Sequence, residues 1–194
     1  MRRYIASIIF VLLVVGLSGA YFFRGYWESR YDPMITRQSR IYRLDERLVW
    51  SLIYEETYFR SGAIGDDDEV GLMQVTPLVA REWAKETGFR EFEKQAADNV
   101  VEFLKDPERN IQIGCWYLEK LRERYRGRPA ETAMTLAAYN AGASRVEEWV
   151  KGSDAELLPE AEFVSRIGIT STRAYVSSIL QRYRKTGQRI SNSS

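Results

Sequence analysis

The spacing of apolar and polar positions predicts helices along most of the chain. In residues 45–59, placing successive residues about 100° apart gathers the apolar side chains on one stripe. The members of this stripe are Leu48, Val49, Leu52 and Ile53. Glu56 falls near the middle of the stripe, whereas its neighbour Glu55 does not. A carboxylate on a helix face shielded from water must pair with another group, become protonated or face a cleft. A protonated carboxyl that faces a cleft has the properties of a general acid.

Residues typical of helix ends divide the rest of the chain. Helix starts are predicted at Asp32-Pro33, Asp45, Thr76-Pro77 and Asp106-Pro107, each an N-cap residue with or without a following proline. The expected helices cover residues 32–42, 46–61, 77–86, the second half of 89–104, 107–127, 129–142, 144–150 and 172–184. Ser144 and Glu147 have capping-box spacing, and a linker is expected up to about Thr170. The fold class is therefore mainly α, and a small hairpin in residues 61–75 would make it α+β.

Residues 5–23 carry no charge and approach the length that spans a bilayer as a helix. The preceding Arg2 and Arg3 predict a cytoplasmic N-terminus, so the remainder would lie in the periplasm. Two interpretations stay open, a single-pass inner-membrane anchor and a cleaved signal peptide. Ser18 and Ala20 have the small-residue spacing of a cleavage site, but the bulky Tyr21 that follows favours the anchor.

The domain organisation follows from these segments. We expect an N-terminal membrane anchor or signal segment with its juxtamembrane linker in residues 1–30, and one helical domain in residues 31–185. Residues 186–194 are expected to be a disordered tail, because they combine basic, serine and asparagine residues without an apolar pattern.

Composition narrows the chemistry that this domain can perform. The 194 residues include 28 basic and 27 acidic side chains and no histidine. A nearly neutral charge gives no reason to expect nucleic acid as a partner. The absence of histidine excludes Ser-His-Asp and Cys-His nucleophiles and histidine zinc sites, so catalysis would depend on carboxylates, Tyr, Lys or Ser. Cys115 lies on an apolar helical stripe and is predicted to be a buried thiol.

Glu56 is the candidate catalytic residue, although acids near helix ends are often simply solvated or capped. The loop after it contains a run of acids, Asp66 to Glu69. Such runs are usually solvated; the alternatives are a metal site and a second catalytic carboxylate. No metal and no cofactor are expected.

Separated motifs in this chain resemble, in order, those of the SLT-type lytic transglycosylases of the lysozyme-like superfamily. The motifs are Glu56-Thr57-Tyr58-Phe59, Gly71-Leu72-Met73-Gln74, Asn110 with Gly114 and Tyr117-Leu118, Ala138-Tyr139-Asn140-Ala141-Gly142, and Thr172-Arg173 with Tyr175-Val176. The resemblance covers about residues 31–185 and departs from the family at three places. Glu55 and Thr57 flank the acid where the family has Ser or Gln, Gly65 and Asp68-Glu69 replace small residues before Gly71, and Ser171 replaces an acid before Thr172.

The resemblance implies a lysozyme-like fold and cleavage of peptidoglycan glycan strands. In this family one Glu first donates a proton to the glycosidic oxygen and then, as a base, takes the C6 hydroxyl proton of MurNAc, which leaves a 1,6-anhydro end. Glu56 would be that residue. The side chains expected to bind substrate are Met73, Gln74, Tyr139, Asn140 and Tyr175.

Two other functions stay open at this point. A water-using muramidase of goose-lysozyme type would need a second carboxylate across from Glu56, which the acidic loop could supply. A non-catalytic cell-wall-binding protein would keep the motifs without turnover. Both would share peptidoglycan as the partner.

Overall fold

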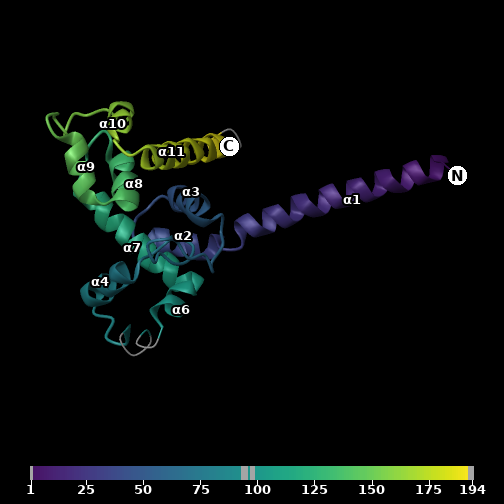
Figure 1. Ribbon diagram of the computed structural model, residues 1–194, viewed down its shortest axis with the longest axis horizontal. Coiled ribbons are helices and arrows are strands. Elements are labelled where there is room, and N and C mark those ends of the chain that lie inside the picture. Colours follow the sequence, from purple (N-terminus) through teal and green to yellow (C-terminus); the bar gives the residue numbers. More distant parts are fainter. Residues whose placement is uncertain (1, 93–95, 97–98, 192–194) are drawn as a thin grey trace. The chain divides into compact units, whose positions relative to one another are not determined.

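A computed structural model describes residues 2–92, 96 and 99–191 (Figure 1). It consists of two units, Met1–Pro33 and Met34–Ser194. The mainly α fold class is confirmed. The helices are α1 (Arg2–Ser29), α2 (Asp32–Ile41), α3 (Glu46–Thr57), α4 (Pro77–Thr87), α6 (Val100–Lys105), α7 (Pro107–Tyr125), α8 (Glu131–Ala141), α9 (Ala143–Val150), α10 (Glu160–Arg166) and α11 (Thr170–Ser191). In place of the hairpin considered for residues 61–75, the structure has isolated antiparallel bridges, Ile64 with Val70 and Val70 with Val75.

The first unit is dominated by α1, which contains the charge-free run. Among the residues that the structure describes, no helix is both long enough and apolar enough to cross a membrane. The membrane span predicted over residues 5–23 is therefore not supported. The helix continues beyond that run into a charged end, where Arg24 pairs with Glu28 at 2.8 Å.

Several predicted helix starts are confirmed by their capping bonds. The side chains of Asp45, Thr76 and Asp106 accept hydrogen bonds from backbone N–H groups in the first turns of α3, α4 and α7. The capping box at Ser144 is wrong. Helix α9 begins at Ala143, directly after Gly142, so Ser144 lies inside the first turn and no side chain caps it.

The C-terminal third contains more helix than its sequence predicts. Helix α10 occupies part of the expected linker, and it buries Phe163 completely. Helix α11 begins two residues before the predicted start and extends to Ser191. It thus takes in residues 186–191 of the predicted tail, while residues 192–194 lie outside the described part of the chain.

In the second unit, α7 is the central helix, with α4, α6 and α8 packed against it (Figure 1). Helix α11 packs against both α3 and α8, so it covers one side of α3. Cys115 is buried in α7, as predicted, and burial raises the pKa of its thiol. The fully buried side chains of α3 and α7 include Val49, Leu52, Ile53, Ile111, Ile113 and Leu118.

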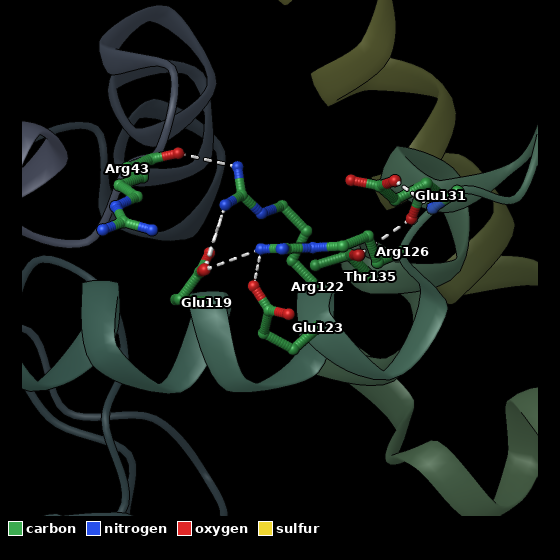
Figure 2. Close-up of polar contacts among 8 residues, drawn as sticks. Arg43, Glu119, Arg122, Glu123, Arg126, Glu131 and Thr135 are labelled. Atoms are coloured by element: carbon green, nitrogen blue, oxygen red, sulfur yellow. Dashed lines mark hydrogen bonds and ion pairs between the residues drawn. The ribbon is translucent and has the colours of Figure 1, made fainter.

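A polar network on the surface of α7 fixes the loop that precedes α3 (Figure 2). Arg122 donates a hydrogen bond to the backbone carbonyl of Arg43 at 2.7 Å and pairs with Glu119. Arg43 has a φ of 52°, a left-handed conformation that a non-glycine residue adopts only at some cost. Arg126 extends the network to Glu123. The start of α3 is therefore held on the central helix.

Asn110, in the first turns of α7, is completely buried, and both its amide oxygen and its amide nitrogen form hydrogen bonds. Its Oδ1 accepts from the backbone N–H of Met73 at 2.8 Å. Its Nδ2 donates to the carbonyls of Val70 and Leu104, at 2.7 and 2.8 Å. One side chain thus satisfies three backbone groups of two segments and fixes the loop over residues 70–73.

We expect Asn110→Ala to lower the free energy of unfolding by about 3–5 kcal/mol, because three buried backbone groups would lose their partner. Urea denaturation followed by circular dichroism measures this. The matched control is Asn99→Ala, which removes the exposed side-chain cap of α6 and should cost about 1 kcal/mol. Equal losses in the two variants would contradict the role given to Asn110.

Candidate active site

Glu56 lies in the last turn of α3, at the edge of the core. The stripe that precedes it is buried as predicted, with Leu48, Val49, Leu52 and Ile53 each at most 6% exposed, whereas Glu56 itself is partly exposed. The helix ends immediately after it, because Tyr58 adopts a left-handed conformation with a φ of 50°. The carboxyl therefore stands where an apolar helix face meets the surface.

The Glu56 carboxyl is bonded by a tyrosine of α11. The Tyr175 hydroxyl donates to Glu56 Oε1 at 2.5 Å, so the two predicted site residues are in direct contact. The pKa of Glu56 is raised to about 7, mainly by burial; the bond from Tyr175 lowers the pKa, and the negative charges of Glu69 and Glu55 raise it. A carboxyl with this pKa is substantially protonated at neutral pH, which is the property a general acid requires.

Tyr139 lies near this pair and binds the backbone of the loop over residues 71–74. Its hydroxyl donates to the carbonyl of Met73 at 2.7 Å. Burial and the nearby Glu56 raise the pKa of Tyr139 well above its ordinary value, so the phenol stays a hydrogen-bond donor at neutral pH. Sequence reasoning placed Tyr139 at the site for substrate contact, but in the structure its hydroxyl is engaged with the backbone.

The loop over residues 71–74 is attached to the end of α3. Thr57, the residue after Glu56, donates a hydrogen bond from its hydroxyl to the carbonyl of Leu72 at 3.2 Å. Met73 is fully buried, and a Cβ on Gly114 would lie 2.5 Å from its sulfur, so only glycine fits there. The sequence predicts that Met73 binds substrate; in the structure its sulfur packs against α7 at Gly114.

Gln74 is partly exposed and has a strained backbone, with a φ of 47°. Its Nε2 donates to the carbonyl of Gly71 at 3.0 Å, which directs Oε1 the other way. A Cβ on Gly65 would lie 2.8 Å from Gln74 Oε1 and 2.5 Å from Glu69 Oε2. The absence of a side chain at Gly65 thus allows these two oxygens to lie close together.

Asn140 is exposed at the end of α8, and its Oδ1 accepts from the Thr172 hydroxyl at 2.7 Å. Gly142, rather than Asn140, supplies the residue that ends the helix, with a φ of 86°. The bond from Thr172 joins the last two motif blocks and orients the Asn140 amide. Neither the pairing nor the role of Thr172 was predicted.

The acidic loop divides into exposed and engaged residues. Asp66, Asp67 and Asp68 are exposed, as expected for a solvated run. Glu69 is folded back, with its Oε2 accepting from the backbone N–H of Asp67 at 2.9 Å. Within the described ranges, no group of three acidic or cysteine side chains could hold a metal ion.

The sequence reasoning missed the polar contacts of Glu55. Its Oε2 accepts from the Ser178 hydroxyl at 2.6 Å and pairs with Arg182 Nη1 at 3.2 Å. Tyr175, Ser178 and Arg182 have i, i+3, i+7 spacing, which puts them on one face of α11. That spacing is visible in the sequence.

Comparison with known proteins matches residues 33–158 to the family model described as Transglycosylase SLT domain. The chain is 34% identical over 122 residues to membrane-bound lytic murein transglycosylase C of Actinobacillus succinogenes, covering 60% of this chain and 32% of that protein. It is 33% identical over 150 residues to soluble lytic murein transglycosylase of Escherichia coli, covering 77% of this chain and 22% of that protein. The match therefore spans about a third or less of these relatives.

Solved structures agree on the fold. The 70 kDa soluble lytic transglycosylase from Escherichia coli has a TM-score of 0.69 with 25% identity, over 80% of this chain and 24% of that one. An inactive mutant of lytic transglycosylase Slt from Pseudomonas aeruginosa also has a TM-score of 0.69, with 23% identity, over 84% of this chain and 25% of that one. The fold implied by the motifs is confirmed.

The raised pKa of Glu56 predicts how stability depends on pH. The folded state binds this proton more tightly than the unfolded chain, so its contribution is complete below about pH 4.5 and is lost as pH rises through about 7. Glu56→Gln removes the titration. We expect the Gln variant to exceed the wild type in free energy of unfolding by up to about 3 kcal/mol at pH 8, and to match it closely at pH 4.5.

Urea midpoints of both proteins at the two pH values measure this difference. The control is Glu46→Gln, at an exposed position in the first turn of the same helix. If the gap between the Glu56→Gln variant and the wild type is the same at both pH values, the Glu56 carboxyl is not held protonated by the fold.

Proposed function

The chain belongs to the Transglycosylase SLT domain family, and from this membership we propose that it is a peptidoglycan lytic transglycosylase. It cleaves the β-1,4 bond between MurNAc and GlcNAc and leaves a 1,6-anhydro-MurNAc end. The observation that carries this proposal is a Glu56 carboxyl whose pKa is raised to about 7 and which is bonded by Tyr175. The names of two relatives, both lytic murein transglycosylases, support it.

Glu56 performs both proton transfers in the proposed reaction. As the bond between C1 and the bridging oxygen breaks, Glu56 gives its proton to that oxygen, which leaves as the GlcNAc hydroxyl. The C6 hydroxyl of MurNAc then attacks C1 and passes its proton to the Glu56 carboxylate. The new C1–O6 bond replaces the broken one, no water enters, and Glu56 ends protonated as it began.

Tyr175 controls this cycle through its bond to Glu56 Oε1. Burial and the neighbouring carboxyl raise the pKa of Tyr175 well above its ordinary value, so its hydroxyl remains a donor in both protonation states of Glu56. A donor stabilises the carboxylate that exists between the two transfers. The same bond fixes the carboxyl orientation, which a proton transfer over hydrogen-bond distance requires.

Gln74 and Asn140 are the side chains that we propose to bind the glycan directly. Asn140 is exposed and Gln74 is partly exposed, and both amides are oriented by a bond to protein, Gln74 to Gly71 and Asn140 to Thr172. Oriented amides suit the hydroxyl and N-acetyl groups of a neutral sugar. Met73 and Tyr139 act one step away, by holding the loop that carries Gln74.

The substrate determines where the domain acts. Peptidoglycan lies outside the inner membrane, so we propose a periplasmic location for residues 31–185. The relatives include proteins named both membrane-bound and soluble, so their names are compatible with either form of attachment.

Digestion of purified peptidoglycan sacculi tests the activity. We expect anhydro-muropeptides, which are lighter by one water than hydrolysis products, when the digest is examined by mass spectrometry. Glu56→Gln should lower the rate of their release by at least about 100-fold, because the isosteric amide has no proton to transfer. The control Glu46→Gln should digest sacculi like the wild type. Equal release by wild type and Glu56→Gln would indicate a wall-binding protein without turnover.

A hydrolytic muramidase is the second candidate, because one observation favours it. The charge of Glu69 acts on Glu56, so a second carboxylate lies within electrostatic reach of the acid. In a hydrolase, Glu69 would activate a water molecule and the products would be reducing ends.

Glu69→Gln separates the two reactions. For the transglycosylase, we expect anhydro products to persist at pH 6, with a greater loss of rate above pH 7, since removing this negative charge lowers the pKa of Glu56. The matched control is Asp68→Asn, an exposed carboxylate of the same loop, which should leave the pH profile unchanged. Reducing ends in the wild-type digest that disappear with Glu69→Gln would establish the hydrolase instead.

A further inference from the structure

The polar contacts between α3 and α11 form a continuous antiparallel series. Asp45 at the start of α3 accepts from the Tyr183 hydroxyl at 2.9 Å, and Glu56 at the other end accepts from Tyr175. Next to Glu56, Glu55 contacts Ser178 and Arg182 of α11. Glu55 therefore lies next to the catalytic carboxyl in sequence and is held by the same helix.

Arg182 makes two contacts with the last turns of α3. Its guanidinium pairs with Glu55 Oε2 at 3.2 Å, and its Cζ lies 3.9 Å from the centre of the Tyr54 ring. The side chains of Glu55 and Arg182 are 26% and 25% exposed, so this pair is less screened by solvent than a typical surface pair. The two contacts fix consecutive residues of α3, Tyr54 and Glu55, directly before Glu56.

We propose that Arg182 is a positioning residue for Glu56, acting through Glu55. It clamps the last turn of α3 onto α11, so that Glu56 meets Tyr175, and its positive charge offsets that of the carboxylate beside Glu56. The proposal rests on the function proposed for Glu56 above. It assigns Arg182 no contact with the reacting atoms.

The charges around Glu56 give this role its physical basis. The titratable groups that interact electrostatically with Glu56 are Glu55 on its own helix, Glu69 in the loop, Tyr139 on α8 and Tyr175 on α11. Two are acidic, and the other two stay neutral near pH 7. The ion pair with Arg182 therefore reduces the negative field of Glu55 on Glu56 and keeps the pKa of Glu56 near the working pH.

The geometric part of the role follows from helix periodicity. Adjacent helical residues project about 100° apart, so the direction of Glu55 determines the direction of Glu56. Tyr175 and Ser178 are one turn apart on α11, and their hydroxyls donate hydrogen bonds to Glu56 and Glu55 respectively. Loss of Arg182 would leave two hydroxyl bonds as the polar contacts of this turn with α11 among those described, from Tyr175 to Glu56 at 2.5 Å and from Ser178 to Glu55 at 2.6 Å.

A titration of Glu56 in the full chain, labelled with ¹³C at the Glu side-chain carboxyls, tests the proposal without depending on activity. The Glu56 resonance is assigned by its absence in Glu56→Gln. We expect Arg182→Met to raise the titration midpoint by about half a pH unit or more, and Glu55→Gln to lower it. The double variant, which loses both charges, should return close to the wild-type midpoint.

Two control variants distinguish this role from general damage. Arg182→Lys keeps the charge and should keep the midpoint near that of the wild type. Arg184→Met removes another ion pair of the same helix, with Glu160, and should leave the midpoint unchanged. An unchanged midpoint in Arg182→Met would overturn the proposal, and a double variant as displaced as Arg182→Met alone would overturn its electrostatic part.

Digestion of sacculi by the same variants separates this proposal from the proposed function. The upper pH limit of glycan cleavage should move with the NMR midpoint in Arg182→Met and Glu55→Gln. Midpoints that shift as expected without anhydro products from the wild type would refute the proposed function alone. Anhydro products from a wild type whose midpoint does not respond to Arg182→Met would refute the role of Arg182 alone.

Discussion

The removal of one carboxyl from water is the constraint on which the rest of the second unit depends. Glu56 completes an apolar helix face whose other members are buried, and this position raises its pKa to about 7. Burial of a carboxyl opposes folding whenever the group is charged, so the surrounding structure must stabilise the helix end by other means. Helix α11 supplies much of that stabilisation, because it receives both ends of α3 through hydroxyl groups, Tyr183 at Asp45 and Tyr175 at Glu56.

The loop over residues 70–74, beside Glu56, is fixed by contacts with the surrounding helices rather than by regular secondary structure of its own. Asn110 binds its backbone, Gly114 leaves room for the Met73 sulfur, and Tyr139 and Thr57 bond the carbonyls of Met73 and Leu72. The bonds from Asn110, Tyr139 and Thr57 fix backbone atoms, while the Gln74 side chain stays partly exposed. Members of the motif blocks thus differ in purpose, since several position the loop that carries Gln74, one of the side chains proposed to bind the glycan.

The sequence could predict what depends on local pattern. The apolar stripe of α3, the caps at Asp45, Thr76 and Asp106, and the burial of Cys115 follow from periodicity and N-cap chemistry, and all are confirmed. Features that depend on neighbouring segments could not be predicted in this way. Met73 is buried because Gly114 lies opposite it, and α10 forms because Phe163 finds a core to enter, and neither contact can be read from local spacing.

The contacts of Glu55 also could not be predicted from local spacing, although they lie beside the candidate active site. Locally, Glu55 reads as an exposed acid off the apolar face, and only the packing of α11 brings Ser178 and Arg182 to it. The charge of Glu55 raises the pKa of Glu56, and it adds to burial, the main cause that brings this pKa to about 7. A cation that acts through the intervening carboxylate can moderate this effect without touching Glu56. Direct contact of an arginine with Glu56 would instead favour the carboxylate and remove the proton that the proposed reaction needs.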